Sequence, residues 1–363
     1  MNSSVAGPLR FGGGTLGGLL RTNPPGSRGI FRAMETAPAR ARLSIAVEAA
    51  LLIAVAAFSV MFAGLHQTRN GVHPPAALER LCAYTAETPY QKRILVPTLV
   101  RAVDVSGIGA KIGFSREDSA RWIEIAASVA FFYALRALLA QFLAGPWAPT
   151  LWALAGLYAL PFLYVIPRAW PFWYPWDLPA VLVTTLGLLW IRRGQWAWYY
   201  WVFPFATLNR ETSVFLILIF ALTQFGKMSW WSLAQHLAVQ TAIWLSIRAL
   251  LGMTFKHHPG VGDFYADALK DNTAALRHAS TWMTLSLVFG LLWLPLAIFV
   301  RWVREGFVRR ALLVVPLFFA AALDLAQFDE LRIYGEMLPL VVLGLACGVS
   351  GWRASRATAL SAR

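Results

Sequence analysis

Long apolar stretches that follow one another along most of the chain constrain this sequence more than any other feature. A helix needs about 20 mostly apolar residues to cross a membrane. Stretches that approach or reach this length occupy residues 43–64, 123–143, 148–166, 178–191, 230–251, 285–300, 311–327 and 334–351. Because 58% of the residues are hydrophobic and only 14% are charged, a soluble fold would expose large apolar patches. The sequence therefore predicts an all-α integral membrane protein surrounded by a lipid bilayer.

A further apolar stretch, from residue 196 to residue 225, is interrupted in its middle by Asn209-Arg210-Glu211-Thr212. Its 30 residues are too many for one straight helix across the bilayer and too few for two full crossings joined by a turn. The length fits two half-height helices that enter and leave on the same face. The predicted architecture is therefore about eight full transmembrane helices plus one re-entrant half-helix pair.

The net charge of +14 predicts the orientation of the chain. Short cytoplasmic loops of membrane proteins collect Lys and Arg. With a re-entrant pair, the basic turns fall on the same side as the N-terminus; they are residues 192–193, 227, 301–310 and 353–356. We therefore expect a multi-pass protein of the bacterial cytoplasmic (inner) membrane with both termini in the cytoplasm. Since topology explains the positive charge, no nucleic-acid partner is expected.

Three regions are predicted along the chain. Residues 1–40 are rich in Gly, Pro, Ser and Arg and are predicted to be a disordered basic cytoplasmic tail. Met34 is an alternative start to Met1. Residues 41–352 form the polytopic membrane domain, whose outer loops at 66–121 and 253–280 carry interfacial helices. Residues 353–363 form a second cytoplasmic tail.

Ionisable residues inside hydrocarbon are candidates for a functional site, because each costs at least a few kcal/mol. The strongest candidates are Asn209, Arg210 and Glu211 in the interrupted stretch. A break between half-helices lets neighbouring side chains turn into one cavity, and non-helical backbone at this depth must be buried in protein or line water. Two interpretations stay open: a ligand-binding site, or an internal ion pair that joins helices.

The first outer loop holds a basic segment at residues 90–101, in which cations and apolar residues alternate with helical spacing. This pattern predicts an amphipathic helix in the outer interface. Its cations, Lys92, Arg93 and Arg101, are candidates to bind a phosphate or diphosphate. The alternative is a surface helix without a ligand.

Two other groups of charges lie at the outer ends of predicted spans. Asp177 sits within an aromatic segment at residues 174–179 and is either functional or a simple helix cap. Acids and one arginine crowd residues 324–336. A solvated turn accounts for Asp329, Glu330 and Arg332, whereas Asp324 and Glu336 lie deeper and are stronger site candidates.

The layout resembles the superfamily of polytopic C-type glycosyltransferases (GT-C fold), which use polyprenyl-phosphate sugars. The similarity covers about residues 43–351 and lies in a long first outer loop with an interfacial helix, further outer loops over the site, and basic cytoplasmic turns. The segment Arg93-Ile94-Leu95-Val96-Pro97, paired with Asn209-Arg210-Glu211-Thr212, also looks like a pattern of bacterial membrane proteins of this kind. The superfamily usually carries an acidic pair soon after the first span, but residues 66–71 hold no acid.

The resemblance implies transfer of a sugar from a polyprenyl-phosphate donor to an envelope acceptor, on the outer face of the membrane, by inverting displacement. Asp177 or Glu87 would accept the proton of the acceptor hydroxyl. Arg93, Arg210 and Arg332 would stabilise the leaving phosphate as its charge develops. The other predicted substrate-binding residues are Lys92, Arg101, Asn209, Glu211, Asp324 and Glu336.

Two alternatives belong to other classes of protein. Broken helices are common in transporters, so a transporter or flippase of a lipid-linked or anionic solute is the second candidate, although the two halves of the chain show no convincing similarity. The third is a non-catalytic membrane partner in envelope assembly. His257-His258 with Asp263 and Asp267 match no specific metal-ligand spacing. No cofactor and no metal site are predicted, and the use of a divalent cation is left open.

Overall fold

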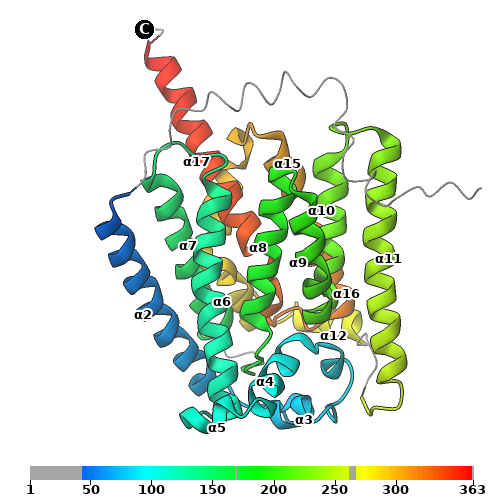
Figure 1. Cartoon of the computed structure of the whole chain (residues 1–363). Coiled ribbons are helices and arrows are strands. Elements are labelled where there is room, and N and C mark those ends of the chain that lie inside the picture. The colour runs from blue at the N-terminus through cyan, green and yellow to red at the C-terminus, as the bar shows by residue number, and fades with distance from the viewer. Residues whose placement is uncertain (1–42, 168–169, 261–266, 362–363) are drawn as a thin grey trace, which may run out of the picture. The chain divides into compact units, whose positions relative to one another are not determined.

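The computed structural model describes residues 43–167, 170–260 and 267–361, and within them it is built of helices (Figure 1). The α-helices are α2 (Ile45–Arg69), α3 (Leu78–Cys82), α4 (Leu95–Val105), α5 (Ile108–Ile112), α6 (Arg116–Leu139), α7 (Trp147–Tyr164), α8 (Asp177–Arg193), α9 (Trp196–Asn209), α10 (Val214–Gln224), α11 (Trp230–Thr254), α12 (Ala268–Ala275), α13 (Ala279–Ser286), α14 (Trp293–Phe299), α15 (Gly306–Leu312), α16 (Val314–Leu325) and α17 (Leu338–Ser361). Short 3₁₀ helices are η2 (Pro74–Ala76), η3 (Tyr90–Lys92), η4 (Glu211–Ser213), η5 (Val288–Leu291), η6 (Val300–Trp302) and η7 (Leu331–Met337). In these parts of the chain the only β-type pairings are two isolated bridges.

The prediction of an all-helical, membrane-type protein is confirmed for these residues. Within them, five helical segments are long and apolar enough to cross a membrane. They are α2, α6, α11, the α15–α16 segment Gly306–Leu325 and the η7–α17 segment Leu331–Ser361. The count of eight full spans stays a prediction, as does the GT-C-like fold. Residues 1–40 lie outside the described residues, and the described part of the predicted C-terminal tail continues α17 as a helix.

The interrupted apolar stretch folds as two short helices around a break. Helix α9 ends at Asn209, Arg210 has an extended backbone with φ −159° and ψ 143°, and η4 then leads into α10. The helices run antiparallel, because Trp196 near the start of α9 packs on Phe220 near the end of α10, with ring centroids 5.3 Å apart. The 14 residues of α9 span about 21 Å at 1.5 Å per residue, less than the hydrocarbon thickness of about 30 Å. Two short helices around a break agree with the length of the stretch, and their re-entry on one face of a bilayer stays a prediction.

The described membrane domain has two chemically different ends. At one end, called here the loop end, lie α3, α4, α5 and α12, which connect the long helices (Figure 1). At the other end, called the basic end, lie the turns that hold Arg192, Lys227 and Arg310. Phe307 at this end packs under the guanidinium of Arg192 and the ammonium of Lys227, and Arg310 donates to the carbonyl of Phe225. The predicted basic turns therefore share one end of the structure.

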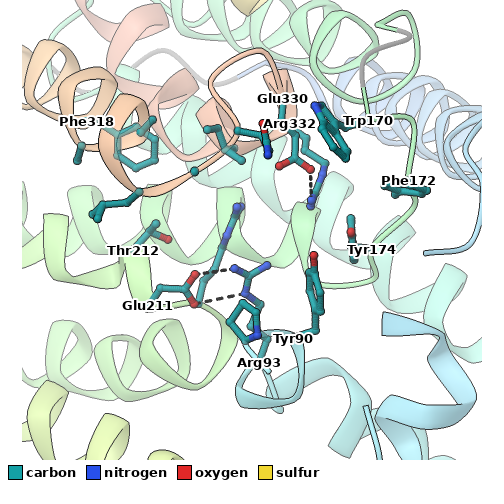
Figure 2. A pocket seen from close by; sticks show the side chains of 18 of the residues that line it. Tyr90, Arg93, Trp170, Phe172, Tyr174, Glu211, Thr212, Phe318, Glu330 and Arg332 are labelled. Atoms are coloured by element: carbon teal, nitrogen blue, oxygen red, sulfur yellow. Dashed lines mark hydrogen bonds and ion pairs between the residues drawn. The ribbon is translucent and has the colours of Figure 1, made fainter. Parts of the chain in front are cut away.

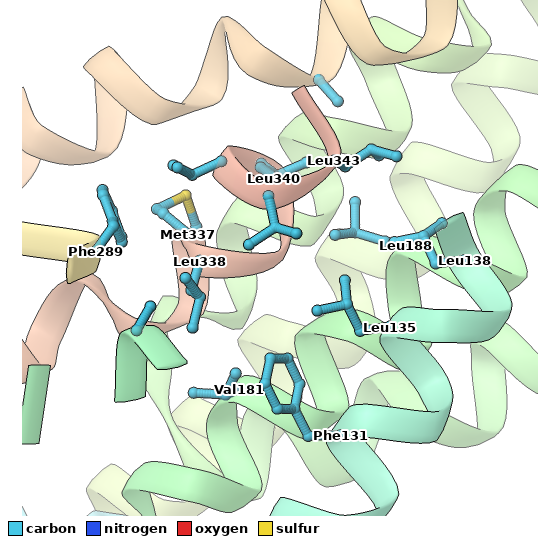
Figure 3. Close-up of a cluster of buried hydrophobic side chains, with 14 of the residues drawn as sticks. Phe131, Leu135, Leu138, Val181, Leu188, Phe289, Met337, Leu338, Leu340 and Leu343 are labelled. Carbon is cyan, nitrogen blue, oxygen red and sulfur yellow. The ribbon is translucent and has the colours of Figure 1, made fainter. Parts of the chain in front are cut away.

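Helix α17 runs through the centre of the packed helices. In its most apolar segment 89% of the residues are buried, against 17% for α2 and 11% for α11, which lie at the periphery. Figure 3 shows Leu338, Leu340 and Leu343 of this region packed with Leu135 and Leu188 of two neighbouring helices. Because α17 follows directly from η7, the position of the charged residues in η7 is fixed by this core.

Two local interactions stabilise the first long helices. Glu48 of α2 accepts two hydrogen bonds from the guanidinium of Arg136 in α6, at 2.6 and 2.7 Å, which pairs charges on two apolar helices. Ser115 caps α6, where its side chain and that of Asp118 form a reciprocal capping box. Such a box satisfies amide groups that the first turn of a helix leaves unpaired.

Glycines in α17 allow close contact with α14 and η6, and this contact can be tested. A Cβ on Gly348 would lie 2.6 Å from the carbonyl oxygen of Phe299, whereas a Cβ on Gly64 of α2 meets nothing within 4 Å. We expect Gly348→Ala to lower the free energy of unfolding by about 1–3 kcal/mol through overpacking. Gly64→Ala should be neutral or stabilising, by up to about 1 kcal/mol, because Ala favours helix. Thermal unfolding in detergent measures both, and equal effects would contradict this packing.

Candidate functional site

A cavity of about 280 Å³ lies at the loop end, next to the break between α9 and α10. Its wall combines residues of the first loop, of the loop before α8, of the break, of α16 and of the segment that leads into η7. Figure 2 shows these side chains converging from separate parts of the chain. The wall has a charged, an aromatic and an apolar part.

The charged part begins with an ion pair between the first loop and the break. Arg93 donates to both carboxylate oxygens of Glu211, at 2.6 and 3.3 Å (Figure 2). The guanidinium of Arg93 also lies 5.3 Å from the ring centroid of Trp176, a cation–π distance. Arg248 of α11 approaches Glu211 at 3.9 Å from another side. Glu211 therefore holds two cations from distant segments.

A second group of charges surrounds Asp177, the first residue of α8. Its side chain is 0% exposed, and one oxygen lies 3.4 Å from Arg332 Nη1 and 3.8 Å from Arg210 Nη1. Arg210 also lies 3.4 Å from Glu336, which accepts a hydrogen bond of 2.5 Å from Thr212. Asp177 thus holds two arginines side by side.

These arginines keep hydrogen-bonding capacity. Arg210 and Arg332 are only 4% and 6% exposed, and both line the cavity. Nε and Nη1 of Arg210 and Nε of Arg332 have no hydrogen-bond partner in the described parts of the chain. Buried donors of this kind are costly unless a partner satisfies them. These three nitrogens are themselves closed to solvent, so an anion in the cavity would contact the other parts of the guanidinium groups that line it.

The aromatic part of the wall consists of Tyr90, Trp170, Phe172, Tyr174 and His73. The His73 ring contacts the Phe172 and Tyr90 rings, with centroids 4.6 and 5.0 Å apart. Burial, and after it the positive charge of Arg332, lower the pKa of His73. The imidazole is therefore neutral at pH 7 and can accept a proton.

The apolar part of the wall comes from α16 and the start of α10. It consists of Phe215, Phe318, Ala321, Ala322, Leu325 and Ala326. The alanines leave room beside the arginines, and Leu325 is exposed at the outer surface of the helices. One cavity therefore places buried cations next to an apolar surface.

The structure brings together part of the predicted site. Arg93, Arg210, Glu211 and Arg332 line the cavity. Asn209, Asp177 and Glu336 lie behind them: Asn209 donates to the carbonyl of Trp176 at 3.0 Å, and the two acids pair with the arginines.

Four predicted residues lie elsewhere. Glu87 pairs with Arg80 at 3.5 Å, Arg101 donates to the carbonyl of Cys82, Asp324 is exposed on α16, and Lys92 is half-buried outside the wall. The prediction of a base at Glu87 therefore finds no support in the geometry.

Two local predictions are corrected. The helix expected over residues 90–101 begins only at Leu95, because the ring of Pro97 fits the first turn of a helix but excludes a longer N-terminal extension. Arg93 leaves the helical path with φ −101° and ψ 69° and turns inward. The solvated turn expected at residues 329–332 does not hold for Arg332, which is buried and pairs with Glu330.

Sequence reasoning missed several wall residues. His73 carries no motif, and the sequence placed Glu330 in a solvated turn, yet both line the cavity. Arg248 lies outside the wall, and its approach to Glu211 was not predicted because it belongs to an apolar helix. The aromatic density of residues 170–176, Trp-Pro-Phe-Trp-Tyr-Pro-Trp, was the available signal for the aromatic wall. It was assigned only to the membrane interface, where such residues are common.

The weak metal-site pattern gains no support. In the described ranges, no group of three or more His, Cys, Asp or Glu side chains is arranged to hold a metal ion. His258 instead lies 2.9 Å from the carbonyl of Ala86, and Asp263 lies outside the described residues.

The chain matches no family model, no curated protein and no solved structure.

Removing Arg210 tests the charge network. We expect Arg210→Met to lower the free energy of unfolding by about 3–5 kcal/mol, since it leaves the buried carboxylate of Glu336 without its cation. A second change, Glu336→Gln, should recover a large part of this loss by removing the unpaired charge. Arg101→Met is the matched control on the exposed surface, with an expected effect below about 0.5 kcal/mol. If Arg210→Met and Arg101→Met are equally mild in thermal unfolding, the network does not stabilise the fold.

The lowered pKa of His73 predicts a pH dependence of stability. The folded protein holds the neutral imidazole, while the unfolded chain takes up a proton near the ordinary value of 6.5. Stability should therefore fall as pH decreases through this value. We expect His73→Gln to reduce this acid sensitivity and His257→Gln, on the surface, to leave it unchanged. Unfolding temperatures from pH 5 to pH 8 measure the difference, and parallel curves for His73→Gln and the parent would contradict it.

Proposed function

We propose that the protein is a membrane glycosyltransferase that takes a sugar from a polyprenyl-phosphate donor and transfers it to an envelope acceptor. The observation that carries the proposal is the meeting of three buried arginines, Arg93, Arg210 and Arg332, with an apolar wall in one cavity. A lipid-linked phosphate combines these two chemistries in one molecule. In this proposal the chain has eight full spans and a re-entrant pair in a GT-C-like fold. The loop end faces the outside of the bacterial cytoplasmic membrane.

The three parts of the wall match three parts of such a donor. Arg210 and Arg332, which line the cavity, suit the phosphate, because guanidinium groups bind phosphate oxygens in pairs. The wall of α16 around Ala321 and Leu325 suits the first units of an isoprenoid chain. The aromatic wall suits a sugar ring, since Tyr and Trp present apolar faces with polar edges.

The chemical step is a displacement at the anomeric carbon of the sugar. The acceptor hydroxyl loses its proton to a base, and its oxygen forms a bond to the anomeric carbon. The bond from that carbon to the phosphate oxygen breaks, and its electron pair stays on the phosphate. Arg210 and Arg332 stabilise the charge that develops there, in a site shielded from water.

The base is assigned to the cavity wall. Asp177 was the first candidate, but its side chain is fully buried and holds Arg210 and Arg332 in place, so we assign it a positioning role. Glu330 and His73 line the cavity and can accept a proton. Neutral His73 carries no hydrogen bond to the described residues, which leaves its ring nitrogens available.

Binding of the lipid carrier can be tested before the sugar is known. We expect polyprenyl phosphate, without a sugar, to raise the unfolding temperature of the purified protein. Arg332→Lys keeps the charge but loses the paired donors, and should weaken binding at least tenfold, whereas Arg101→Lys should have no effect. The proposal fails if polyprenyl phosphate does not raise the unfolding temperature of the parent protein. It also fails if the carrier stabilises Arg332→Lys and Arg101→Lys equally.

Transfer is measured as release of polyprenyl phosphate from a panel of polyprenyl-phosphate sugars, with envelope extract as the acceptor source. General-base catalysis contributes about 10²–10⁴-fold, so the variant that removes the base, Glu330→Gln or His73→Gln, should lose at least a hundredfold in kcat. Asp177→Asn should weaken donor binding instead. Equal turnover in all three variants and the parent would remove these residues from the mechanism.

A transporter or flippase is the second candidate, favoured by the break between α9 and α10, which lies beside the cavity. Discontinuous helices form solute sites in many transporters. Proteoliposomes distinguish the two classes, because an enzyme does not accumulate an anionic solute or move a labelled lipid between leaflets. Movement without sugar transfer would favour this second function.

A further inference from the structure

The basic end of the structure carries a cation cluster that the proposed function does not use. Its members are Arg192, Lys227, Arg309 and Arg310. Arg192 lies over the rings of Phe142 and Phe307, at 4.8 and 5.9 Å from the centroids, and Lys227 lies 5.3 Å from the centroid of Phe307. Arg310 donates to the carbonyl of Phe225 at the end of α10. Aromatic rings and a backbone carbonyl therefore hold Arg192, Lys227 and Arg310 in place, whereas Arg309 is exposed.

No carboxylate within the described ranges forms an ion pair with any of these four cations. Burial, then repulsion from Arg192 and from Arg310, lower the pKa of Lys227, and Glu305 is the acid that opposes this effect. At the loop end, by contrast, Arg93, Arg210 and Arg332 each lie next to a carboxylate. The basic end thus carries positive charge in excess of the nearby Glu305 carboxylate.

A groove of about 410 Å³ opens beside this cluster. Gly306, Arg309, Arg310 and Leu313 line it. A Cβ on Gly306 would meet nothing within 4 Å, so the start of α15 leaves the groove open.

An apolar strip continues from the groove along α15 and α16. Leu313 and Leu317 follow Arg309 at intervals of four residues, a spacing that places side chains on one face of a helix. They are 55% and 49% exposed. The groove therefore has Arg309 and Arg310 in its wall. The exposed side chains of Leu313 and Leu317 extend from it along α16.

We propose that this groove binds one anionic phospholipid. Its phosphodiester would accept hydrogen bonds from Arg309 and Arg310, with Lys227 and Arg192 adding favourable charge, and one acyl chain would lie along Leu313 and Leu317. Basic sites between or beside membrane helices recognise anionic head groups through these same contacts. The competing explanation is that the cations only set the topology of the chain. That explanation requires net charge at this end but neither a groove nor a specific pair of arginines.

The test uses the purified full chain and compares two variants with the same change in charge. Arg309→Gln with Arg310→Gln removes the proposed contacts, whereas Arg353→Gln with Arg356→Gln removes two cations from α17 at the same end. Each protein is exchanged into mixed micelles with phosphatidylglycerol or phosphatidylcholine, and the lipid retained is measured by native mass spectrometry. We expect the parent and the α17 variant to retain phosphatidylglycerol, and the groove variant to retain at least fivefold less. Phosphatidylcholine should be retained weakly by all three.

Several results would overturn the proposal. They are equal loss of phosphatidylglycerol in both variants, equal retention in all proteins, and equal retention of the zwitterionic lipid. Unfolding temperatures in phosphatidylcholine show whether the groove variant is folded. If it is not, Leu313→Asn with Leu317→Asn provides the second measurement, with the same expected loss of phosphatidylglycerol.

A further arm separates a lipid from free phosphate. Inorganic phosphate that competes with phosphatidylglycerol at equal concentration would overturn the lipid assignment, because the acyl chain would then contribute nothing.

Discussion

The fold at the loop end depends on a network of buried charges that no single segment could satisfy. Its cations are Arg93, Arg210, Arg248 and Arg332, and its carboxylates are Asp177, Glu211, Glu330 and Glu336. Removing one such charge from water costs several kcal/mol, and only a well-placed partner of opposite sign offsets that cost. The members come from the first loop, the start of α8, the break after α9, α11 and η7. Each segment can therefore hold its charge only when the others are in place.

This dependence explains why the chain interrupts an apolar stretch at considerable energetic cost. The extended backbone at Arg210 lets Arg210 and Glu211 face different partners, which neighbours about 100° apart on a continuous helix would not reach together. Arg210 turns toward Asp177 and Glu336, and Glu211 toward Arg93. The adjacent helices are anchored by the core: α17 starts directly after Glu336 and is the most buried of the long helices. The site is thus built on rigid elements, and the first loop is attached to it through the Arg93–Glu211 pair.

The sequence predicted those features that depend on local pattern or on simple charge balance. Apolar length indicated the helices, and the polar interruption at residues 209–212 indicated the break between α9 and α10. What it did not predict depends on contacts between distant segments. Asp177 and Glu87 both looked like acids at the outer surface, yet one is sealed behind arginines and the other lies on the surface, because only packing decides which way a loop residue turns. The start of α4 at Leu95, by contrast, could have been predicted from the sequence. Pro97 fits only the first turn of a helix, so the helix cannot begin much earlier.

The balance of charge differs between the two ends, and this difference has consequences for ligands. At the loop end four cations face four carboxylates, so in the proposed function an anion is held by hydrogen bonds to the guanidinium groups that line the cavity rather than by net charge. A ligand bound in this way can leave without exposing a large uncompensated field, which suits a substrate that must bind and depart in every cycle. At the basic end the cations outnumber the nearby Glu305 carboxylate, and an anion there adds Coulomb attraction to its hydrogen bonds. In the two proposals, the same residue types therefore favour exchange of a substrate at the loop end and long-lived binding of a lipid at the basic end.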